Sequence, residues 1–202
     1  MAGSQENSSG QRRHLWRMAL WMMAALLWLL PLAAMLFTDE VNWDETDLIV
    51  FGAMLLGACG TYELATRLTG NSAYRAAVGV AIVAAFILIW MNLAVGIIGS
   101  EDNPANLMYG GVLAAPVFGG IIVRFKPYGM AQVLVATALA QTLVGGIALS
   151  AGLGATGANW PRVIVVLTGF FSALWLLSAW LFRKAAQEPA FPSTEHRYGV
   201  PK

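Results

Sequence analysis

The chain has 202 residues, of which 58% are hydrophobic and 11% are charged, and its formal net charge at pH 7 is +1. A soluble domain is about 45 to 50% apolar and about 25% charged, so this composition indicates a membrane protein. A net charge so close to zero gives no field that attracts nucleic acid, and we expect no nucleic-acid binding. The single cysteine, Cys59, cannot form an intrachain disulfide, and the two histidines, His14 and His196, lie near the chain ends, so we expect no cofactor and no bound metal.

Six apolar runs are long enough to cross a membrane as helices, which takes roughly 20 mostly apolar residues. They cover residues 18–37, 48–68, 76–99, 107–123, 129–149 and 163–182. The sequence therefore predicts an all-α fold, a polytopic membrane helix bundle with six transmembrane helices. We expect one transmembrane domain over 17–184, flanked by polar segments at 1–16 and 185–202 that are predicted to be disordered tails.

The charges between the spans predict the orientation. Eleven of the twelve basic residues lie on one side of the predicted membrane, whereas seven of the eleven acidic residues lie on the other. By the positive-inside rule the basic side is cytoplasmic, which places both termini in the cytoplasm. The segment QRRHLWR before the first span also fits the start of a secretory signal. The apolar run that follows is longer than the about 7 to 15 residues of a signal core, so we expect this span to remain.

Polar side chains are few within the spans, and none is ionisable at mid-depth, where ion-coupled transporters usually place one. Glu63 and Arg67 stand four residues apart in the second span, on one helix face, and we interpret them as a local ion pair. Asn92 in the third span and Gln141 in the fifth are the other candidates for a polar pathway or for helix contacts. The many glycines of the spans are expected to bring helices close together.

Two short patterns have both a functional and a structural interpretation. In SEDNPAN, Asn103 fits the N-cap of the fourth helix and Pro104 its first residue. Asn-Pro-Ala also occurs in water channels, but these use two copies and this chain has one. GLGATG, residues 152–157, matches a dinucleotide-binding pattern that requires a preceding strand. Because an apolar span precedes it here, we interpret it as an outer loop.

Three stretches, NLAVGIIGSEDNPANLMYGGV, RLTGNSAYRAAVG and ALWLLSAWLFRKAA, resemble a group of small six-span bacterial inner-membrane proteins to which no activity is assigned. The resemblance implies a bacterial inner (cytoplasmic) membrane and six helices. It contributes no catalytic or binding residue.

No nucleophile with a nearby base and no set of metal ligands is visible in the sequence, so we expect a protein that is not an enzyme. We interpret the chain as an accessory or scaffold subunit of a membrane assembly. It would contact the lipid bilayer and a membrane-protein partner or a second copy of itself. The alternative is a small-solute transporter or channel with a weakly polar pathway lined by Asn92, Gln141 and Glu63.

Overall fold

The computed structural model of the chain describes residues 3–38, 42–157 and 159–188. Within this part of the chain, six helices are long and apolar enough to span a membrane, and no strand occurs. The predicted all-α fold with six helices of membrane-spanning length is confirmed. The chain divides into two compact units, Met1–Gly70 and Asn71–Lys202.

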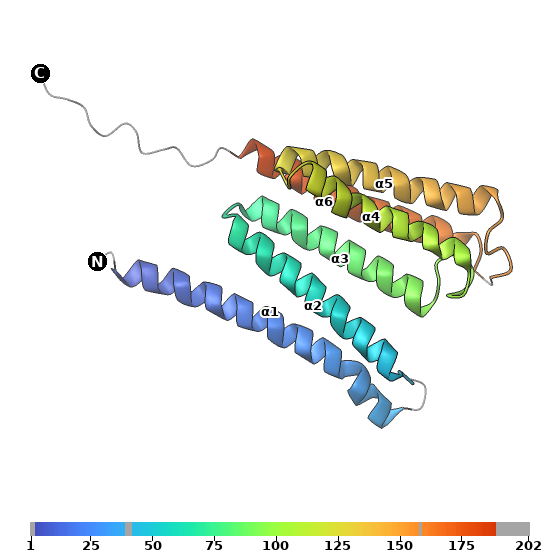
Figure 1. The fold of residues 1–202 in the computed structure, drawn as a ribbon, viewed down its shortest axis with the longest axis horizontal. Coiled ribbons are helices and arrows are strands. Elements are labelled where there is room, and N and C mark those ends of the chain that lie inside the picture. The colour runs from blue at the N-terminus through green and yellow to red at the C-terminus, as the bar shows by residue number, and fades with distance from the viewer. Residues whose placement is uncertain (1–2, 39–41, 158, 189–202) are drawn as a thin grey trace, which may run out of the picture. The chain divides into compact units, whose positions relative to one another are not determined.

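The first unit contains two antiparallel helices, α1 (Gly3–Phe37) and α2 (Glu45–Leu68), which pack against each other (Figure 1). Residues 3–16, which the sequence analysis predicts to be a disordered tail, are helical in the structure. This segment contains several good helix formers, namely Gln, Glu and Arg. A helix that already exists extends far more easily than a new one starts, so the apolar part of α1 favours this extension.

A capping box starts α2. The Asp47 backbone N–H donates to Asp44 Oδ1 at 2.9 Å, and the Asp44 backbone N–H donates to Asp47 Oδ2 at 3.2 Å. These bonds satisfy N–H groups that the first helical turn leaves without a partner. Two acids of the segment before the second span therefore have a local structural role, while Asp39 and Glu40 lie outside the described residues.

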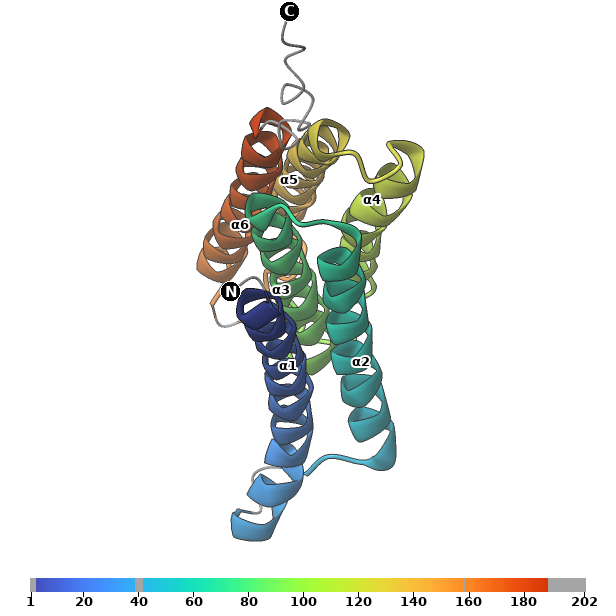
Figure 2. The ribbon, with the colours of Figure 1, turned by 90° about the vertical axis from the view of Figure 1, so that its left-hand side faces the viewer.

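The second unit consists of four long helices and a short 3₁₀-helix, in the order α3 (Ser72–Ala94), η1 (Pro104–Leu107), α4 (Met108–Ile122), α5 (Pro127–Ser150) and α6 (Arg162–Gln187). Helix α6 packs against both α3 and α5, and α4 packs against α5 (Figure 2). Phe171, Trp175 and Phe182 of α6 are at most 1% exposed, and they form one core with buried residues of the other three helices. The core of this unit is therefore centred on α6.

The third predicted span is longer than the helix that the structure contains. Helix α3 ends at Ala94, whereas the sequence predicts a span that continues to Gly99. Gly96 and Gly99 have φ values of 68° and 83°, in the left-handed region that glycine adopts at little cost. This conformation ends the helix, and the chain then turns back toward η1.

Candidate functional site

A charged cluster connects the two helices of the first unit around Glu63. Its Oε1 is 2.6 Å from Arg17 Nη2 and 2.5 Å from Arg67 Nη2, and its Oε2 accepts a hydrogen bond of 2.9 Å from Trp21 Nε1. The Glu63 side chain is 10% exposed, whereas those of Arg17 and Arg67 are 51% and 61% exposed. The carboxylate is thus enclosed, while both guanidinium groups reach the surface.

The sequence predicts only part of this cluster. The structure contains the local pair of Glu63 and Arg67, and it adds Arg17 and Trp21 from the other helix of the hairpin. Arg17 and Trp21 are four residues apart on α1 and so share a helix face. This spacing is the one feature of the sequence that could have indicated their common contact with Glu63. Both oxygens of Glu63 have hydrogen-bonding partners, and the carboxylate holds the guanidinium groups of Arg17 and Arg67 in place.

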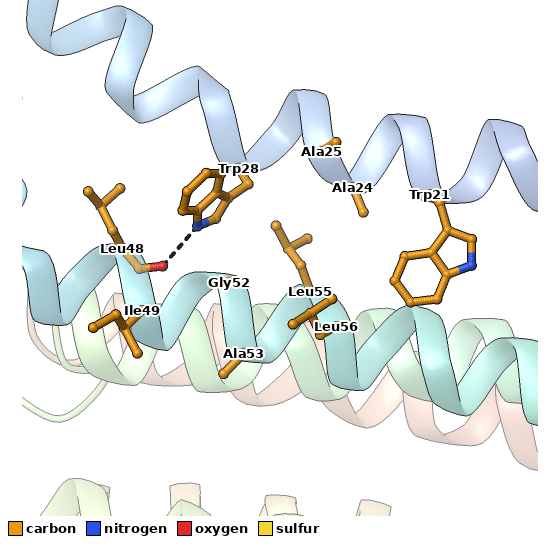
Figure 3. A pocket seen from close by; sticks show the side chains of 10 residues that line it. All are labelled: Trp21, Ala24, Ala25, Trp28, Leu48, Ile49, Gly52, Ala53, Leu55 and Leu56. Atoms are coloured by element: carbon orange, nitrogen blue, oxygen red, sulfur yellow. Dashed lines mark hydrogen bonds between the residues drawn. The ribbon is translucent and has the colours of Figure 1, made fainter.

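An open apolar groove of about 460 Å³ lies between α1 and α2 in the same unit. Figure 3 shows Trp21 and Trp28 at its two ends, with Ala24 and Ala25 between them. Trp28 Nε1 donates to the backbone oxygen of Leu48 at 2.9 Å. The groove exists because small residues separate two large indole rings along one helix.

Gly52 allows Trp28 to approach the backbone of α2 so closely. A Cβ at residue 52 would lie 2.9 Å from Trp28 Nε1, so any larger residue would push the indole away. This glycine therefore packs within the unit, as the sequence analysis expects for glycines in the spans.

Three residues of the second unit, Tyr109, Gln141 and Thr168, have buried polar side-chain atoms. Gln141 is 0% exposed and Tyr109 is 1% exposed. Thr168 Oγ1 lies directly against Gly145, one helical turn from Gln141, and beside the Tyr109 hydroxyl. Within the described residues, neither amide atom of Gln141 has a hydrogen-bond partner. Such unpaired polar atoms are uncommon in a protein interior.

The remaining predicted pathway residue, Asn92, is bonded within its own helix. Its Nδ2 donates to the backbone oxygen of Leu88 at 2.8 Å, while its buried Oδ1 has no partner among the described residues. The candidates therefore fall into separate units, Asn92 and Gln141 in the second, Glu63 and Arg67 in the first.

The segment SEDNPAN forms a structured turn that leads into η1. Asn103 is the N-cap of η1, with its side chain accepting from the Ala105 N–H at 3.0 Å, and Pro104 is the first residue of η1. Asn106, which the sequence analysis does not single out, is 9% exposed. Its Oδ1 accepts from the backbone N–H groups of Ile97 and Ile98, and its Nδ2 donates to the Ser100 oxygen. The second asparagine of this segment thus organises the whole turn.

The cap gives a direct prediction for Asn103. We expect Asn103→Asp to unfold with a free energy near that of the wild type, since aspartate caps a helix as well as asparagine does. Asn103→Ala should lower the free energy of unfolding by roughly 0.5 to 2 kcal/mol. Equilibrium unfolding in mixed detergent micelles would measure both. An Asp variant as unstable as the Ala variant would show that the cap is not the role of this side chain.

The described residues contain no group of three His, Cys, Asp or Glu side chains that could hold a metal ion. Helix α5, and not a strand, precedes GLGATG, so the backbone geometry of a dinucleotide-binding turn is not formed there. Gly154 of this loop instead packs against Gly99.

Comparison with protein-family models, with curated proteins and with solved structures finds no match for this chain. The resemblance to six-span bacterial membrane proteins therefore stays a prediction.

Proposed function

We propose that the chain is a multi-pass protein of a bacterial inner membrane, with both termini in the cytoplasm. In this role it is a non-enzymatic accessory or scaffold subunit of a membrane assembly. Six helices of sufficient length and apolarity support the membrane location. The orientation is supported by the positions of the basic residues. Arg124 and Lys126 lie in the connection between α4 and α5, at the end of the second unit where Tyr74 of α3 contacts Phe125 and Phe182.

One observation carries the scaffold role, namely an open face of small residues on α2. Ala53, Gly57 and Thr61 are exposed and repeat every four residues. A Cβ at Gly57 would meet no atom within 4 Å, whereas one at Gly145 in α5 would collide with Thr168. In lipid, faces of this kind let helices approach closely and gain packing energy, so an open one favours association with a further helix.

The test of this role is whether the open face is needed for association. The wild-type protein, extracted in mild detergent, should co-purify with a second membrane protein or with a tagged copy of itself. Gly57→Ile should lose the companion, because the branched side chain separates the backbones. Gly146→Ile is the matched control, since Gly146 also lies in open space but on α5. A wild-type protein without any companion, or equal loss in both variants, would contradict the proposal.

The second candidate function is a small-solute transporter or channel, and the buried unpaired amide of Gln141 is the observation that favours it. A solute that passed through the second unit would find hydrogen-bonding groups at Gln141, Tyr109 and Thr168. Burying an amide without a partner in an apolar core destabilises the fold, so a role in binding a solute would account for the unpaired amide of Gln141.

The Gln141→Met variant distinguishes the two candidates. Methionine has a similar volume and needs no hydrogen bonds, so we expect the free energy of unfolding to rise by about 1 to 2 kcal/mol. Under the scaffold proposal the companion protein is retained. A variant that is more stable but loses a solute flux seen with wild-type protein in liposomes would instead establish the transporter.

A further inference from the structure

We propose that the first unit holds one anionic phospholipid, with its phosphate at Arg17 and Arg67 and an acyl chain in the groove between α1 and α2. This inference rests on the proposed membrane location, and it adds a ligand that neither the scaffold nor the transporter function requires. All the residues involved belong to the first unit.

The charged end of the site has N–H donors that do not contact Glu63. Each guanidinium group carries five N–H donors, and one nitrogen of each contacts Glu63. The side chains of Arg17 and Arg67 are about half exposed, so their other donors face outward. Two arginines and one carboxylate leave a net charge of +1 on the cluster. A planar guanidinium group can donate two parallel hydrogen bonds to two oxygens of one phosphate, which makes a phosphate a suitable ligand for the cluster.

The Glu63 carboxylate keeps the two arginines together. Two like charges on neighbouring helices would normally repel each other, but here both contact the same oxygen, Oε1. The carboxylate is also fixed by Trp21. The positions of both guanidinium groups are therefore set before any ligand arrives, which lowers the entropy cost of binding.

The apolar end of the site begins at the same tryptophan. Trp21 donates to Glu63 and also lines the groove, so its ring joins the charged cluster to the apolar surface. In Figure 3 the groove continues from Trp21 past Ala24 toward Trp28. Tryptophan prefers the level where headgroups meet hydrocarbon, which puts a phosphate beside the arginines and an acyl chain along the groove.

Because the charged cluster and the apolar groove are continuous, the site favours a lipid over a soluble anion. A free phosphate could contact the arginines, but it would leave the groove to other molecules and gain nothing from it. A phospholipid with an anionic headgroup satisfies both ends at once, and a zwitterionic lipid adds a cation beside two arginines. The chemistry therefore favours an anionic phospholipid such as phosphatidylglycerol.

Native mass spectrometry of the full-length protein in mild detergent tests the site, with phosphatidylglycerol and phosphatidylcholine added in equal amounts. Wild-type protein should retain phosphatidylglycerol with about tenfold preference. The triple variant Arg17→Gln/Glu63→Gln/Arg67→Gln removes one net positive charge and leaves no unpaired ion, and it should lose most of that preference. Lys126→Gln, the control, makes the same change in net charge in the second unit and should keep it.

The groove is tested by Ala25→Leu, which adds bulk at an exposed lining position between Trp21 and Trp28 without altering charge. This variant should release phosphatidylglycerol while its melting temperature stays close to that of the wild type. If the triple variant fails to fold, Ala25→Leu and the wild type decide the question. Glycerol 3-phosphate and inorganic phosphate, added as competitors without acyl chains, should not displace the lipid.

Equal retention of both lipids by the wild type, or an unchanged preference in a folded triple variant, would overturn the proposal. Displacement by inorganic phosphate would identify a free-phosphate site and overturn it as well. These failures are distinguishable from failure of the proposed function. A protein that is not integral to the membrane would be extracted from membranes by alkaline carbonate, before any lipid is added.

Discussion

Asn106→Ala is expected to be the most destabilising substitution in the turn between α3 and α4, lowering the free energy of unfolding by about 2 to 5 kcal/mol. The Asn106 side chain accepts from the Ile97 and Ile98 N–H groups at 3.1 and 2.9 Å and donates to the Ser100 oxygen at 2.7 Å. Ile97 and Ile98 are at most 1% exposed, so water cannot replace the lost acceptor. Each buried N–H group left unpaired costs about 1 to 3 kcal/mol.

Asn103→Ala provides the comparison for this prediction. It removes an asparagine from the same turn, but that asparagine accepts a single hydrogen bond in a more open position. Equilibrium unfolding in mixed detergent micelles should therefore give Asn106→Ala a clearly lower free energy of unfolding than Asn103→Ala. Equal losses would mean that the turn is not held by the three bonds of Asn106.

Gly154→Ala is expected to lower the free energy of unfolding by about 2 to 4 kcal/mol, for two reasons that add. Its φ of 74° lies in the left-handed region. In addition, a Cβ at this position would lie 2.6 Å from the backbone nitrogen of Gly99 and 3.0 Å from its Cα. Backbone atoms cannot move aside as the end of a flexible side chain can, so the two loops would have to separate.

Gly152→Ala is the matched control for this contact. Gly152 has a φ of 65° in the same loop, but a Cβ there would meet no atom within 4 Å. This variant should show only the conformational cost of about 1 to 2 kcal/mol. The difference between the two variants, measured by the same unfolding titration, isolates the contact between the loops. No difference would show that the loops do not touch at Gly99 and Gly154.

Features that depend on neighbouring residues in the sequence could be predicted. The six apolar helices follow from the length of the apolar runs, and the position of Asn103 before Pro104 follows from the chemistry of a helix start. The pair of Glu63 and Arg67 follows from a spacing of four residues on one helix. Each of these rests on interactions within a few residues, which the sequence shows directly.

Features that depend on packing between distant segments could not be predicted. Trp21 bonds to Glu63 across 42 positions of the chain. In the sequence, Asn106 looks like any polar residue near the start of a helix. Its role becomes visible only in the fold, where the N–H groups of Ile97 and Ile98 donate to its side chain. The helical residues 3–16 were missed for a different reason, since polar composition alone does not prevent an existing helix from extending.

We expect the chain to cross a membrane six times, with both ends in the cytoplasm. Labelling of single cysteines with a membrane-impermeant maleimide in intact bacterial cells tests it most directly, in a Cys59→Ala background that removes the only native thiol. Four of the five connections between spans are sampled, by the variants Asn42→Cys, Ser100→Cys, Gly70→Cys and Lys126→Cys. Asn42→Cys and Ser100→Cys should react in intact cells, whereas Gly70→Cys and Lys126→Cys should react only after permeabilisation. Reversal of any pair, or reaction of all four in intact cells, would contradict the topology and with it the proposed place of this protein in the membrane.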